Sequence, residues 1–587
     1  MALLAVRAVT APRIERRVVP ALTGAWPQHV HPVLRRVYAA RGIVSPDEVE
    51  YRLAGLLPPT LGGMDRACGL LEAAIRDDAR VIVVGDFDCD GATGTAVAVR
   101  GLRLLGARAV GYAVPNRMRH GYGLSPVIVE ELLPRKPDLL ITVDNGIAAH
   151  AGVAAAKAQG MRVIVTDHHL PGVALPDADA IVNPCVPGDE FPSKSLAGVG
   201  VMFYLLLALR SRMRESGRFA ANAEPDLSGL LDLVALGTVA DLVPLDRNNR
   251  ILVAAGLKRI RAGRACAGIA ALFAAGKRDT ARAVAGDLGF AVGPRLNAAG
   301  RLEDMTIGIE CLLTDDASRA SELAETLSSI NAERRELQAG MVEQAQTEVH
   351  KWKMQHGDDG MPHGVVLFDP DWHHGVIGLV ASKLKESLHR PVIACAPAGE
   401  NGGEVKASGR SIPGFHLRDA LAEVDTRHPG LISRFGGHAM AAGLSLNRAD
   451  LEKFGEAFDA VARAHLQPEM LDAILLTDGE LAPTDFSLDL ARQLRQAGPW
   501  GQGFPEPAFD GEFAVESWKV LGETHLRMDF RHASFPQPLR AIAFGAYNGA
   551  QPPARVRAVY ALDVNEWNGV DRLQLLIRHL EPARPSR

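Results

Sequence analysis

The sequence predicts an α/β protein in which a long helix joins a parallel-sheet domain to a second α/β domain, with a small β-barrel after it. Three observations predict this architecture. Helical and short apolar segments alternate between residues 64 and 250, which is typical of parallel βαβ units. A polar segment at 316–352 contains no proline and indicates one uninterrupted helix. From 470 to 580 helix signals fade and short alternating strands follow one another, which suggests a small barrel, although periodicity alone does not separate a barrel from a sandwich.

The length of 587 residues implies several domains, because a single hydrophobic core stops growing near about 250–300 residues. The first segment is rich in proline and arginine, and we expect it to pack on the first domain. The predicted divisions are an N-terminal extension at 1–60, a first domain at 61–315, a connecting helix at 316–352, a second domain at 363–468 and a β domain at 470–580.

The expected elements follow the hydrophobic pattern along the chain. In the first domain they are helices at 64–78, 93–105, 125–133 and 148–159, and strands at 81–84, 107–114, 138–143, 162–166 and 180–183, with helices from 250 to 315. In the second domain they are a strand at 365–368, a helix at 375–388, a strand at 391–397 and a closing helix at 449–465. In the β domain they are strands at 518–521, 526–530, 540–544, 556–562 and 572–577.

Acidic clusters are the most informative feature of the first domain. Three of them, GDFDCDG, VDNG and TDHH, each follow a short apolar run, and VAD comes later. The carboxyl ends of parallel strands converge on the ligand crevice of an open sheet. We therefore expect one site that contains Asp86, Asp88, Asp90, Asp144, Asp167, His168, His169 and Asp241. So many acidic groups would repel one another unless cations lay among them, so the sequence predicts a metal centre.

Carboxylates with imidazoles and no thiolate suit hard divalent ions, so we expect two ions of Mn²⁺ or Mg²⁺. Asp144 is the natural bridge between two such ions. His169 is then left to contact the scissile phosphate or to assist proton transfer; the alternative is a structural imidazole hydrogen-bonded to a strand. Cys89 lies between two proposed ligands, but it is not expected to bind metal, since successive side chains of an extended loop point opposite ways.

Composition and net charge exclude few classes of protein. The net charge of −5 is not the basic balance expected of a protein that coats duplex DNA, yet an acidic centre and a local basic groove are compatible with a nuclease. The six cysteines are scattered without a C-x-x-C pair, so neither a zinc ribbon nor a disulfide framework is indicated. The chain shows no targeting segment and no apolar run of membrane-spanning length, so we expect a cytoplasmic protein.

Motifs along most of the chain resemble one family. The DHH triplet at 167–169 stands with DFDCDGATGT, VDNG and GTVADLVPL, and later come SGRS, RFGGHAMAAG and GPWGQGFPEPAF. Together these resemble the DHH phosphoesterase superfamily and, within it, the RecJ-type single-stranded-DNA exonucleases, over residues 60 to 580. In the last motif Trp500 and Phe504 depart from the family's usual Phe and Asn, which puts the inter-domain turn in doubt rather than the chemistry.

The resemblance assigns roles to the acidic residues. It implies Asp88, Asp90, Asp144, His168 and Asp241 as direct metal ligands, and Asp86 and Asp167 as outer residues or further ligands. The catalytic set that it implies is Asp86, Asp144, His168 and His169.

The resemblance also implies residues that bind DNA phosphates. Arg117 matches an arginine that contacts the terminal phosphate. Arg295, Asn297 and Arg301 lie in a glycine-bounded segment, and one of the two arginines is expected to reach the backbone; the sequence does not decide which. The second domain, of the DHHA1 type, contributes Ser408, Arg410, Gly436, Gly437 and His438 to phosphate binding.

The activity that the resemblance implies is 5′ to 3′ hydrolysis of single-stranded DNA to mononucleotides by two-metal-ion catalysis, in bacterial recombination, repair and mismatch correction. It implies a monomer with an oligonucleotide-binding (OB) barrel, working beside a single-strand-binding protein and a RecQ-type helicase. A small-substrate DHH phosphodiesterase acting on short oligonucleotides or cyclic dinucleotides is one alternative, but such relatives resemble only the first two domains. A non-catalytic DNA-binding scaffold is the other, and the intact acidic motifs argue against it.

Overall fold

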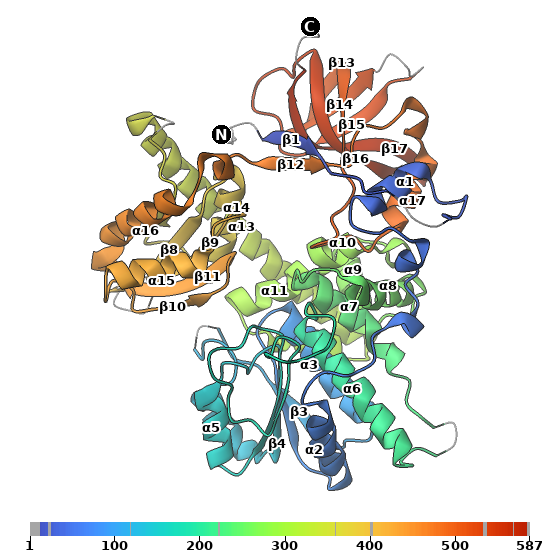
Figure 1. Ribbon diagram of the computed structural model, residues 1–587, viewed down its shortest axis with the longest axis vertical. Coiled ribbons are helices and arrows are strands. Elements are labelled where there is room, and N and C mark those ends of the chain that lie inside the picture. The colour runs from blue at the N-terminus through green and yellow to red at the C-terminus, as the bar shows by residue number, and fades with distance from the viewer. Residues whose placement is uncertain are drawn as a thin grey trace.

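Figure 1 shows the computed structural model as three lobes: the parallel-sheet domain at the bottom, a second α/β domain at the left and a β-barrel at the top right. The structure describes residues 12–583 apart from 22–24, 118, 221–222, 358–359, 399–402, 532–536 and 568. The predicted fold class is confirmed. Among the described residues, no helix combines the length and the apolar character needed to span a membrane.

The first domain is built on a five-stranded parallel sheet of order β3-β2-β4-β5-β6. The order reverses direction at β2, so the chain leaves a crevice beside the carboxyl ends of β2 and β4. The strands are β2 (Val81–Val84), β3 (Val110–Ala113), β4 (Leu139–Val143), β5 (Arg162–Thr166) and β6 (Ala180–Val182). The sequence therefore predicted the edge of the sheet at which the acidic clusters meet.

Helices cover both faces of this sheet, which is why its strands are continuous apolar runs. Alternate residues of β2 belong to two separate cores: Val81 and Val83 pack with α2, α3 and α6, whereas Ile82 and Val84 pack with α4 and α5. The helices are α2 (Met64–Arg76), α3 (Cys89–Leu104), α4 (Pro126–Leu132), α5 (His150–Ala158) and α6 (Gly198–Glu215).

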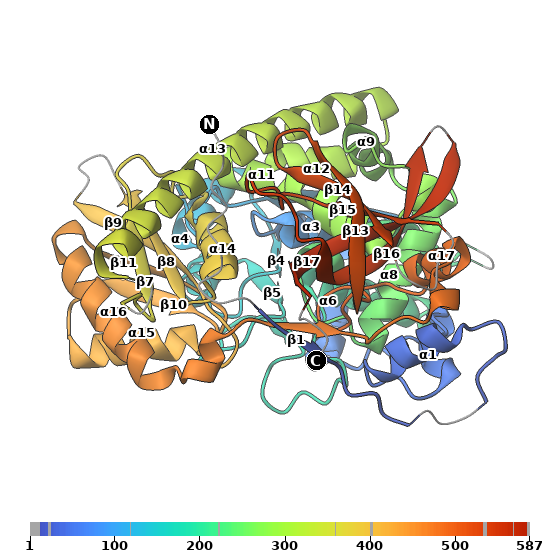
Figure 2. The same cartoon turned by 90° about the horizontal axis from the view of Figure 1, so that it is seen from above.

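A helical layer completes the domain and leads into the connecting helix α13, Ala317–His356. Its other members are α7 (Leu231–Ala240), α8 (Arg247–Arg261), α9 (Ala267–Ala275), α10 (Ala285–Asp287), α11 (Gly293–Leu302) and α12 (Thr306–Leu313). The α13 helix begins where the Asp316 carboxylate accepts hydrogen bonds from two backbone N–H groups. It runs past the predicted end at 352 until Gly357, whose positive φ of 73° stops it. Seen from above, α13 extends over both α/β domains (Figure 2).

The second domain has a mixed five-stranded sheet of order β10-β11-β9-β8-β7, in which only β7 and β8 are parallel. Its strands are β7 (Val365–Phe368), β8 (Val392–Ala398), β9 (Glu404–Arg410), β10 (Arg434–Gly437) and β11 (Ala441–Asn447). Its helices are α14 (Ile377–Leu388), α15 (Leu417–Arg427) and α16 (Leu451–His465).

The C-terminal strands form a barrel in which β13 pairs with both β14 and β16. The strands are β13 (Phe509–Leu521), β14 (His525–Arg531), β15 (Leu539–Ala543), β16 (Arg555–Trp567) and β17 (Val570–Pro582), preceded by α17 (Leu488–Gln496). The barrel excludes a simple sandwich, an alternative that periodicity could not exclude.

The N-terminal extension packs on more than the first domain, which is where the sequence placed it. Its strand β1 (Arg13–Arg16) pairs in parallel with β12 (Ile474–Thr477), the linker that enters the barrel domain (Figure 1). Tyr38, which lies in α1 (Pro32–Ala39), packs its ring against the rings of Trp500 and Phe504. The sequence missed this contact because a four-residue edge strand has no periodicity of its own.

Candidate metal centre and substrate cleft

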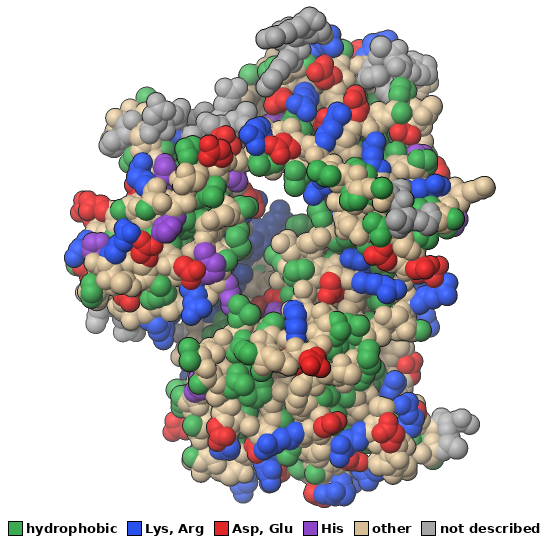
Figure 3. Space-filling view, viewed as in Figure 1, with side chains coloured by type: hydrophobic (Ala, Val, Ile, Leu, Met, Phe, Trp, Pro, Cys, Tyr) green, Lys and Arg blue, Asp and Glu red, His purple; other side chains and the backbone are tan. Residues whose placement is uncertain are grey.

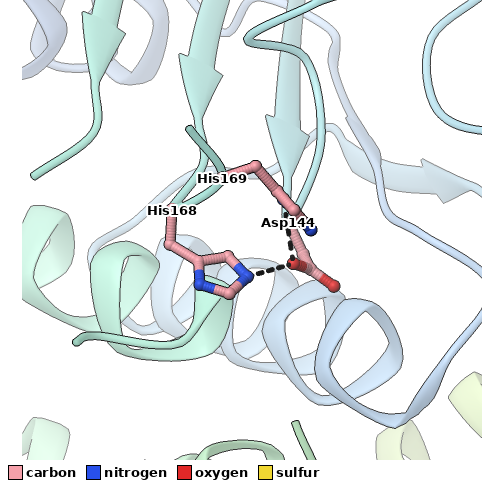
Figure 4. Close-up of side chains that lie close together, drawn as sticks. All are labelled: Asp144, His168 and His169. Carbon is pink, nitrogen blue, oxygen red and sulfur yellow. Dashed lines mark ion pairs between the residues drawn. The ribbon is translucent and has the colours of Figure 1, made fainter. Parts of the chain in front are cut away.

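The acidic clusters meet at the carboxyl edge of the first sheet. The imidazole Nε2 of His168 lies 3.0 Å from the Asp144 carboxylate (Figure 4). The same nitrogen lies 3.6 Å from the Asp241 carboxylate. It also lies 4.0 Å from the Asp90 carboxylate. Asp144 follows β4, His168 follows β5 by one residue, and Asp241 ends α7, so the predicted convergence of distant segments is present in the structure.

The GDFDCDG loop differs in one respect from the extended turn that the sequence suggested. Helix α3 already begins at Cys89, because the Asp88 carboxylate caps it by accepting hydrogen bonds from the N–H groups of Asp90 and Gly91. Asp90 thus lies in the first helical turn, where its carboxylate accepts the N–H groups of two residues at the start of α6. Gly91 is required here, since a Cβ would lie 2.5 Å from the backbone of Asp86.

Asp144 is held in the left-handed region with φ 62° by its neighbour. The Asn145 side chain donates to the carbonyls of Val84 and Val143 and accepts the N–H of Leu124. This amide ties together three loops at the carboxyl end of the sheet. It therefore fixes a backbone conformation that few non-glycine residues adopt and that aspartate tolerates better than most.

Asp167 supports the two histidines that follow it. One carboxylate oxygen accepts the backbone N–H groups of His168 and His169, and the ring Nδ1 of His169 lies 2.7 Å from the same oxygen. The other oxygen accepts the N–H of Ile147. Burial alone would raise the pKa of Asp167, but the hydrogen bond and charge of His169 lower it. Asp167 is thus placed to orient His169, the outer role that the sequence considered for it.

The metal centre is electrostatically strained without cations. Burial first, and then neighbouring aspartates, raises the pKa of Asp86, Asp144 and Asp241 well above the ordinary value and that of Asp90 to about 7. Burial lowers the pKa of His168 to about 4, so its imidazole is neutral and able to bind a metal near neutral pH.

The donor atoms fit divalent metal ions. Three overlapping groups place ligand atoms within 4.8 Å of one another: Asp86, Asp88 and Asp144; Asp144, His168 and His169; and Asp90, His168 and Asp241. Within the described part of the chain, Oδ1 of Asp86, Oδ1 of Asp144 and Nε2 of His168 are buried and form no hydrogen bond, although the last two atoms lie 3.0 Å apart as an ion pair. Oxygen and imidazole donors with orphaned atoms suit Mn²⁺ or Mg²⁺. Asp144 belongs to two of the groups, as a ligand that bridges two ions would. Asp86 belongs to one group, so its carboxylate is among the possible metal ligands.

Cys89 does not join this donor set. Its thiol is buried, and burial followed by the charges of Asp88 and Asp90 raises its pKa, so it stays protonated. A thiolate ligand would need the opposite shift.

The metal centre opens into a cavity of about 1220 Å³ between the two α/β domains. The acidic end is lined by Asp86, Asp88, Asp167 and His169. The other end is basic and is lined by Arg117, Arg301, Ser408 and Arg410. Figure 3 shows the hollow between the left lobe and the rest of the molecule, with Lys and Arg side chains in its depth and His side chains on its rim.

The acidic and basic ends meet at Phe87, the residue between two of the metal-loop aspartates. The Arg117 guanidinium lies 3.9 Å from the centre of the Phe87 ring, and its Nε donates to the carbonyl of Gly300. A Cβ on Gly300 would lie 1.7 Å from the Phe87 carbonyl, so glycine allows α11 to touch the metal loop. The arginine and the metal loop are therefore held in one fixed arrangement.

The basic end is as strained as the acidic end. Burial first, and then neighbouring arginines, lowers the pKa of Arg301 and Arg410, and burial also lowers that of Arg117. Arg301 donates to the carbonyl of Gly375, which joins the first domain to the second. Ile377 and Gly378, the first residues of α14, line the same end and direct a helix N-terminus toward it. An anion is the partner that suits such a pocket.

The RFGGHAMAAG motif of the second domain contributes three residues to the cleft, each with a different role. Gly436 lines the cavity, and a Cβ there would meet nothing within 4 Å. Gly437 also lines the cavity and is required by the β10–β11 hairpin, because its φ is 144° and a Cβ would lie 2.4 Å from the Ala441 carbonyl. The ring of His438 stacks on that of His169 at 6.2 Å between centroids, which joins the two domains across the metal centre.

Two residues predicted to bind phosphate face elsewhere. Arg295 donates to Ser328 and to the carbonyls of Ala275 and Ala291, so its guanidinium is occupied within the helical layer. The Asn297 side chain accepts the N–H of Cys89, so it supports the metal loop. Of the two arginines between which the sequence could not choose, the structure places Arg301 in the cavity.

The sequence reasoning did not single out four residues of the cleft. The Tyr122 hydroxyl donates to the Asp144 carbonyl, and the Asn145 amide fixes the loop that carries the same aspartate. Lys406 and His374 line the basic end. Tyr122 sits between two glycines with positive φ in RHGYG, a signal of a shaped loop that could have drawn attention to it.

Comparison with known proteins matches three family descriptions. The DHH family N-terminal domain matches residues 80–238, the DHHA1 domain 362–464 and the RecJ OB domain 477–579. The single-stranded-DNA-specific exonuclease RecJ of Dickeya dadantii is 50% identical over 563 residues, which cover 95% of this chain and 97% of that protein. The matches span the barrel as well as both α/β domains, which favours the exonuclease over the small-substrate alternative.

The comparison with solved structures supports the same family. The crystal structure of RecJ from Thermus thermophilus with Mn²⁺ has a TM-score of 0.80 and 32% identity, over 98% of this chain and 80% of that one. The same enzyme with Mg²⁺ has a TM-score of 0.73 and 30% identity, over 98% of this chain and 79% of that one.

Proposed function

The chain belongs to the RecJ family of single-stranded-DNA-specific exonucleases, and from that premise we propose that it hydrolyses single-stranded DNA from the 5′ end, releasing 5′-mononucleotides. The observation that carries the proposal is the cavity that joins an acidic metal centre to a pocket of buried arginines. A terminal phosphate in the arginine pocket would fix how far along the strand the metal centre acts. One nucleotide would then be removed at a time.

The donor set suits two divalent ions, Mn²⁺ or Mg²⁺. Asp86, Asp88 and Asp144 would hold one, and Asp90, His168 and Asp241 the other. When bound, such ions polarise the scissile phosphate, lower the pKa of an attacking water and stabilise the leaving oxygen.

Protein side chains do the rest of the work. Arg117, Arg301 and Arg410 hold the terminal phosphate through charge-assisted hydrogen bonds. Asp167 fixes the Nδ1 side of the His169 ring, which leaves Nε2 to exchange a proton with the departing oxygen. The hydroxyl of Tyr122, 3.4 Å from that ring, limits its rotation.

Location and partners belong to the same proposal. Family membership supports a monomer in the bacterial cytoplasm, acting in recombination and repair beside a single-strand-binding protein and a RecQ-type helicase.

The direct test uses long single strands labelled at either the 5′ or the 3′ end, with duplex controls and either metal ion. Immediate release of labelled mononucleotide from the 5′-labelled strand, absent in Asp144→Asn, supports the proposal. Early release of the 3′ label would reverse the polarity. Cleavage of dinucleotides alone would point to a small-substrate enzyme, and tight binding without cleavage would point to a scaffold.

A further inference from the structure

A second basic pocket lies outside the cleft, where the barrel domain meets the helical layer of the first domain. It is a cavity of about 460 Å³. Its lining residues come from α8, α17, β16 and β17 and from residues 281–284 just before α10, elements that Figure 1 shows at the right. Its charged lining residues are Arg261, Arg282, Arg492, Arg495 and Asp571. Four cations against one lining carboxylate leave a clear excess of positive charge.

The four arginines are not equivalent. Arg282 and Arg492 pair with Asp571 at 3.3 and 2.6 Å, and Arg282 also pairs with Glu566. The pairs of Arg282 cross between the two domains and explain how the barrel domain docks on the helical layer, whereas Arg492, on α17, holds Asp571 from within the barrel domain.

Arg261 and Arg495 take no part in that network. Arg261 donates through Nε to the carbonyl of Ala283, and burial lowers its pKa. Within the described ranges, neither Arg261 nor Arg495 forms an ion pair with a carboxylate, whereas Arg282 and Arg492 both do. A docking role accounts for two arginines and leaves two guanidinium groups that line the cavity and can bind an anion.

The chain itself links this pocket to the metal centre. Residues 281–284 line the pocket, and the next turns lead to Gly293, where an added Cβ would lie 3.9 Å from the Cys89 sulfur. About ten residues, helical from Ala285 onward, separate the two places, which corresponds to roughly 15 Å. A single strand of several nucleotides can span such a distance, within the about 4–16 nucleotides that single-strand sites occupy.

An exposed aromatic side chain lies on the same connection. Phe290, in the π-helical turn between α10 and α11, is 87% exposed. Bases stack readily on an exposed aromatic ring of this kind. In the sequence, Phe290 lies between the pocket residues 281–284 and Gly293, which approaches Cys89 of the metal loop, as a stacking residue along a bound strand would.

We propose that this pocket binds backbone phosphates of the single-stranded DNA several nucleotides beyond the cleaved end, with Arg261 and Arg495 as its phosphate ligands. The proposal rests on the proposed function and adds a site to it. The absence of an aromatic side chain among the described lining residues disfavours a free nucleotide, since a base would find no stacking surface inside the pocket.

The test compares a strand of about 30 nucleotides with one of about two, which occupies the cleavage site alone and is shorter than the about 4–16 nucleotides of a single-strand site. Arg261→Gln with Arg495→Gln should raise the KM for the long strand about threefold to tenfold and leave kcat/KM for the short strand unchanged. In an Asp144→Asn background, the slope of log affinity against log salt should fall by about 1.4, which is about 0.7 for each phosphate that the variant no longer neutralises.

Two controls separate binding from docking. Asp571→Asn removes the docking carboxylate but makes the pocket more positive, so affinity for the long strand should be equal or higher. Arg76→Gln, an exposed arginine paired with Asp77 on the first domain, should change nothing. An unchanged salt slope in the double variant, or an equal loss of affinity in Asp571→Asn, would overturn the proposal in favour of pure docking. Failure of the unmodified protein to cleave either strand would instead refute the proposed function.

Discussion

The two ends of the cleft are built from opposite charges by the same means. At one end, burial and mutual repulsion raise the pKa of Asp86, Asp144 and Asp241; at the other, burial lowers that of Arg117, Arg301 and Arg410, with repulsion between arginines adding to it for the last two. Each end is costly in the protein alone, because like charges are gathered out of water. Because the charges of the two ends differ in sign, each end suits a different partner: a cation at the acidic end and a phosphate at the basic end.

The ends also differ in how their residues are supplied. The acidic residues all come from one domain, most of them from loops at the carboxyl edge of its sheet and Asp241 from the end of α7, so their positions are fixed when that domain folds. The basic end draws on both α/β domains and is closed by the bond from Arg301 to Gly375. We therefore expect the acidic end to be rigid and the basic end to depend on how the two domains meet.

The largest expected effect is at the acidic end. Asp144→Asn should lower the cleavage rate about 10³-fold or more, because it removes the carboxylate shared by two donor groups. Asparagine tolerates the positive φ at this position, so the fold should survive. Without metal the variant should melt at a higher temperature than the unmodified protein, since one repelling charge is gone. Single-turnover kinetics and thermal melts in EDTA measure both; a lower melting temperature would argue against electrostatic strain at the metal centre.

At the basic end the expected effect is smaller and selective. Arg301→Gln should raise the KM for 5′-phosphorylated strands about 10- to 100-fold, the usual result of losing a charged hydrogen bond. The KM for 5′-hydroxyl strands should change little. Arg295→Gln is the matched control, because its guanidinium is occupied away from the cavity. Equal losses on both kinds of strand, or the same selectivity from Arg295→Gln, would contradict the assignment of this pocket.

The metal-free protein should show a pH dependence set by the acidic end. A carboxyl group with a raised pKa stabilises the fold below its unfolded value of about 4, and that stability is lost as pH rises through the folded pKa, about 7 for Asp90. His168, with a pKa lowered to about 4, acts in the opposite direction, but only below about 6.5.

Between about pH 6.5 and 8 the melting temperature in EDTA should therefore fall, by about 2–5 °C. Mn²⁺ should reduce the fall, because it neutralises the same carboxylates. A rise in melting temperature over this interval without metal would show that the buried carboxylates do not repel one another as their raised pKa values imply.

The smallest expected effect concerns Cys89. Its buried thiol stays protonated and lies outside the donor set, so Cys89→Ala should keep cleavage within about twofold of the unmodified rate. The Mn²⁺ concentration for half-maximal activity should not move. A large shift in that concentration would place the sulfur on the metal after all.

The same contrast explains what the sequence could predict. The acidic residues follow apolar strands, and the convergence of parallel strands is a general rule, so Asp86, Asp144 and His168 could be placed together in advance. The fold class followed from alternating elements in the same way. The basic end depends on the meeting of two domains, which no local pattern encodes.

Individual arginines show this limit clearly. Arg295 and Arg301 lie in one short helix, and only its packing decides which faces the cavity. The sequence analysis also missed the start of α3, which the single capping side chain of Asp88 decides. It missed the placement of β1, which depends on pairing with the distant strand β12. Tyr122 and Asn145 act through backbone groups of other loops, interactions that residue type alone does not reveal.

The central claim is that the two ends bind opposite partners independently, and thermal melts test it most directly. Mn²⁺ and inorganic phosphate, added separately, should each raise the melting temperature of the unmodified protein. Asp144→Asn should lose the response to Mn²⁺ and keep the response to phosphate, and Arg301→Gln should do the reverse. If both variants lose both responses, or if phosphate stabilises Arg301→Gln as well as the unmodified protein, the account of two separate ends is wrong.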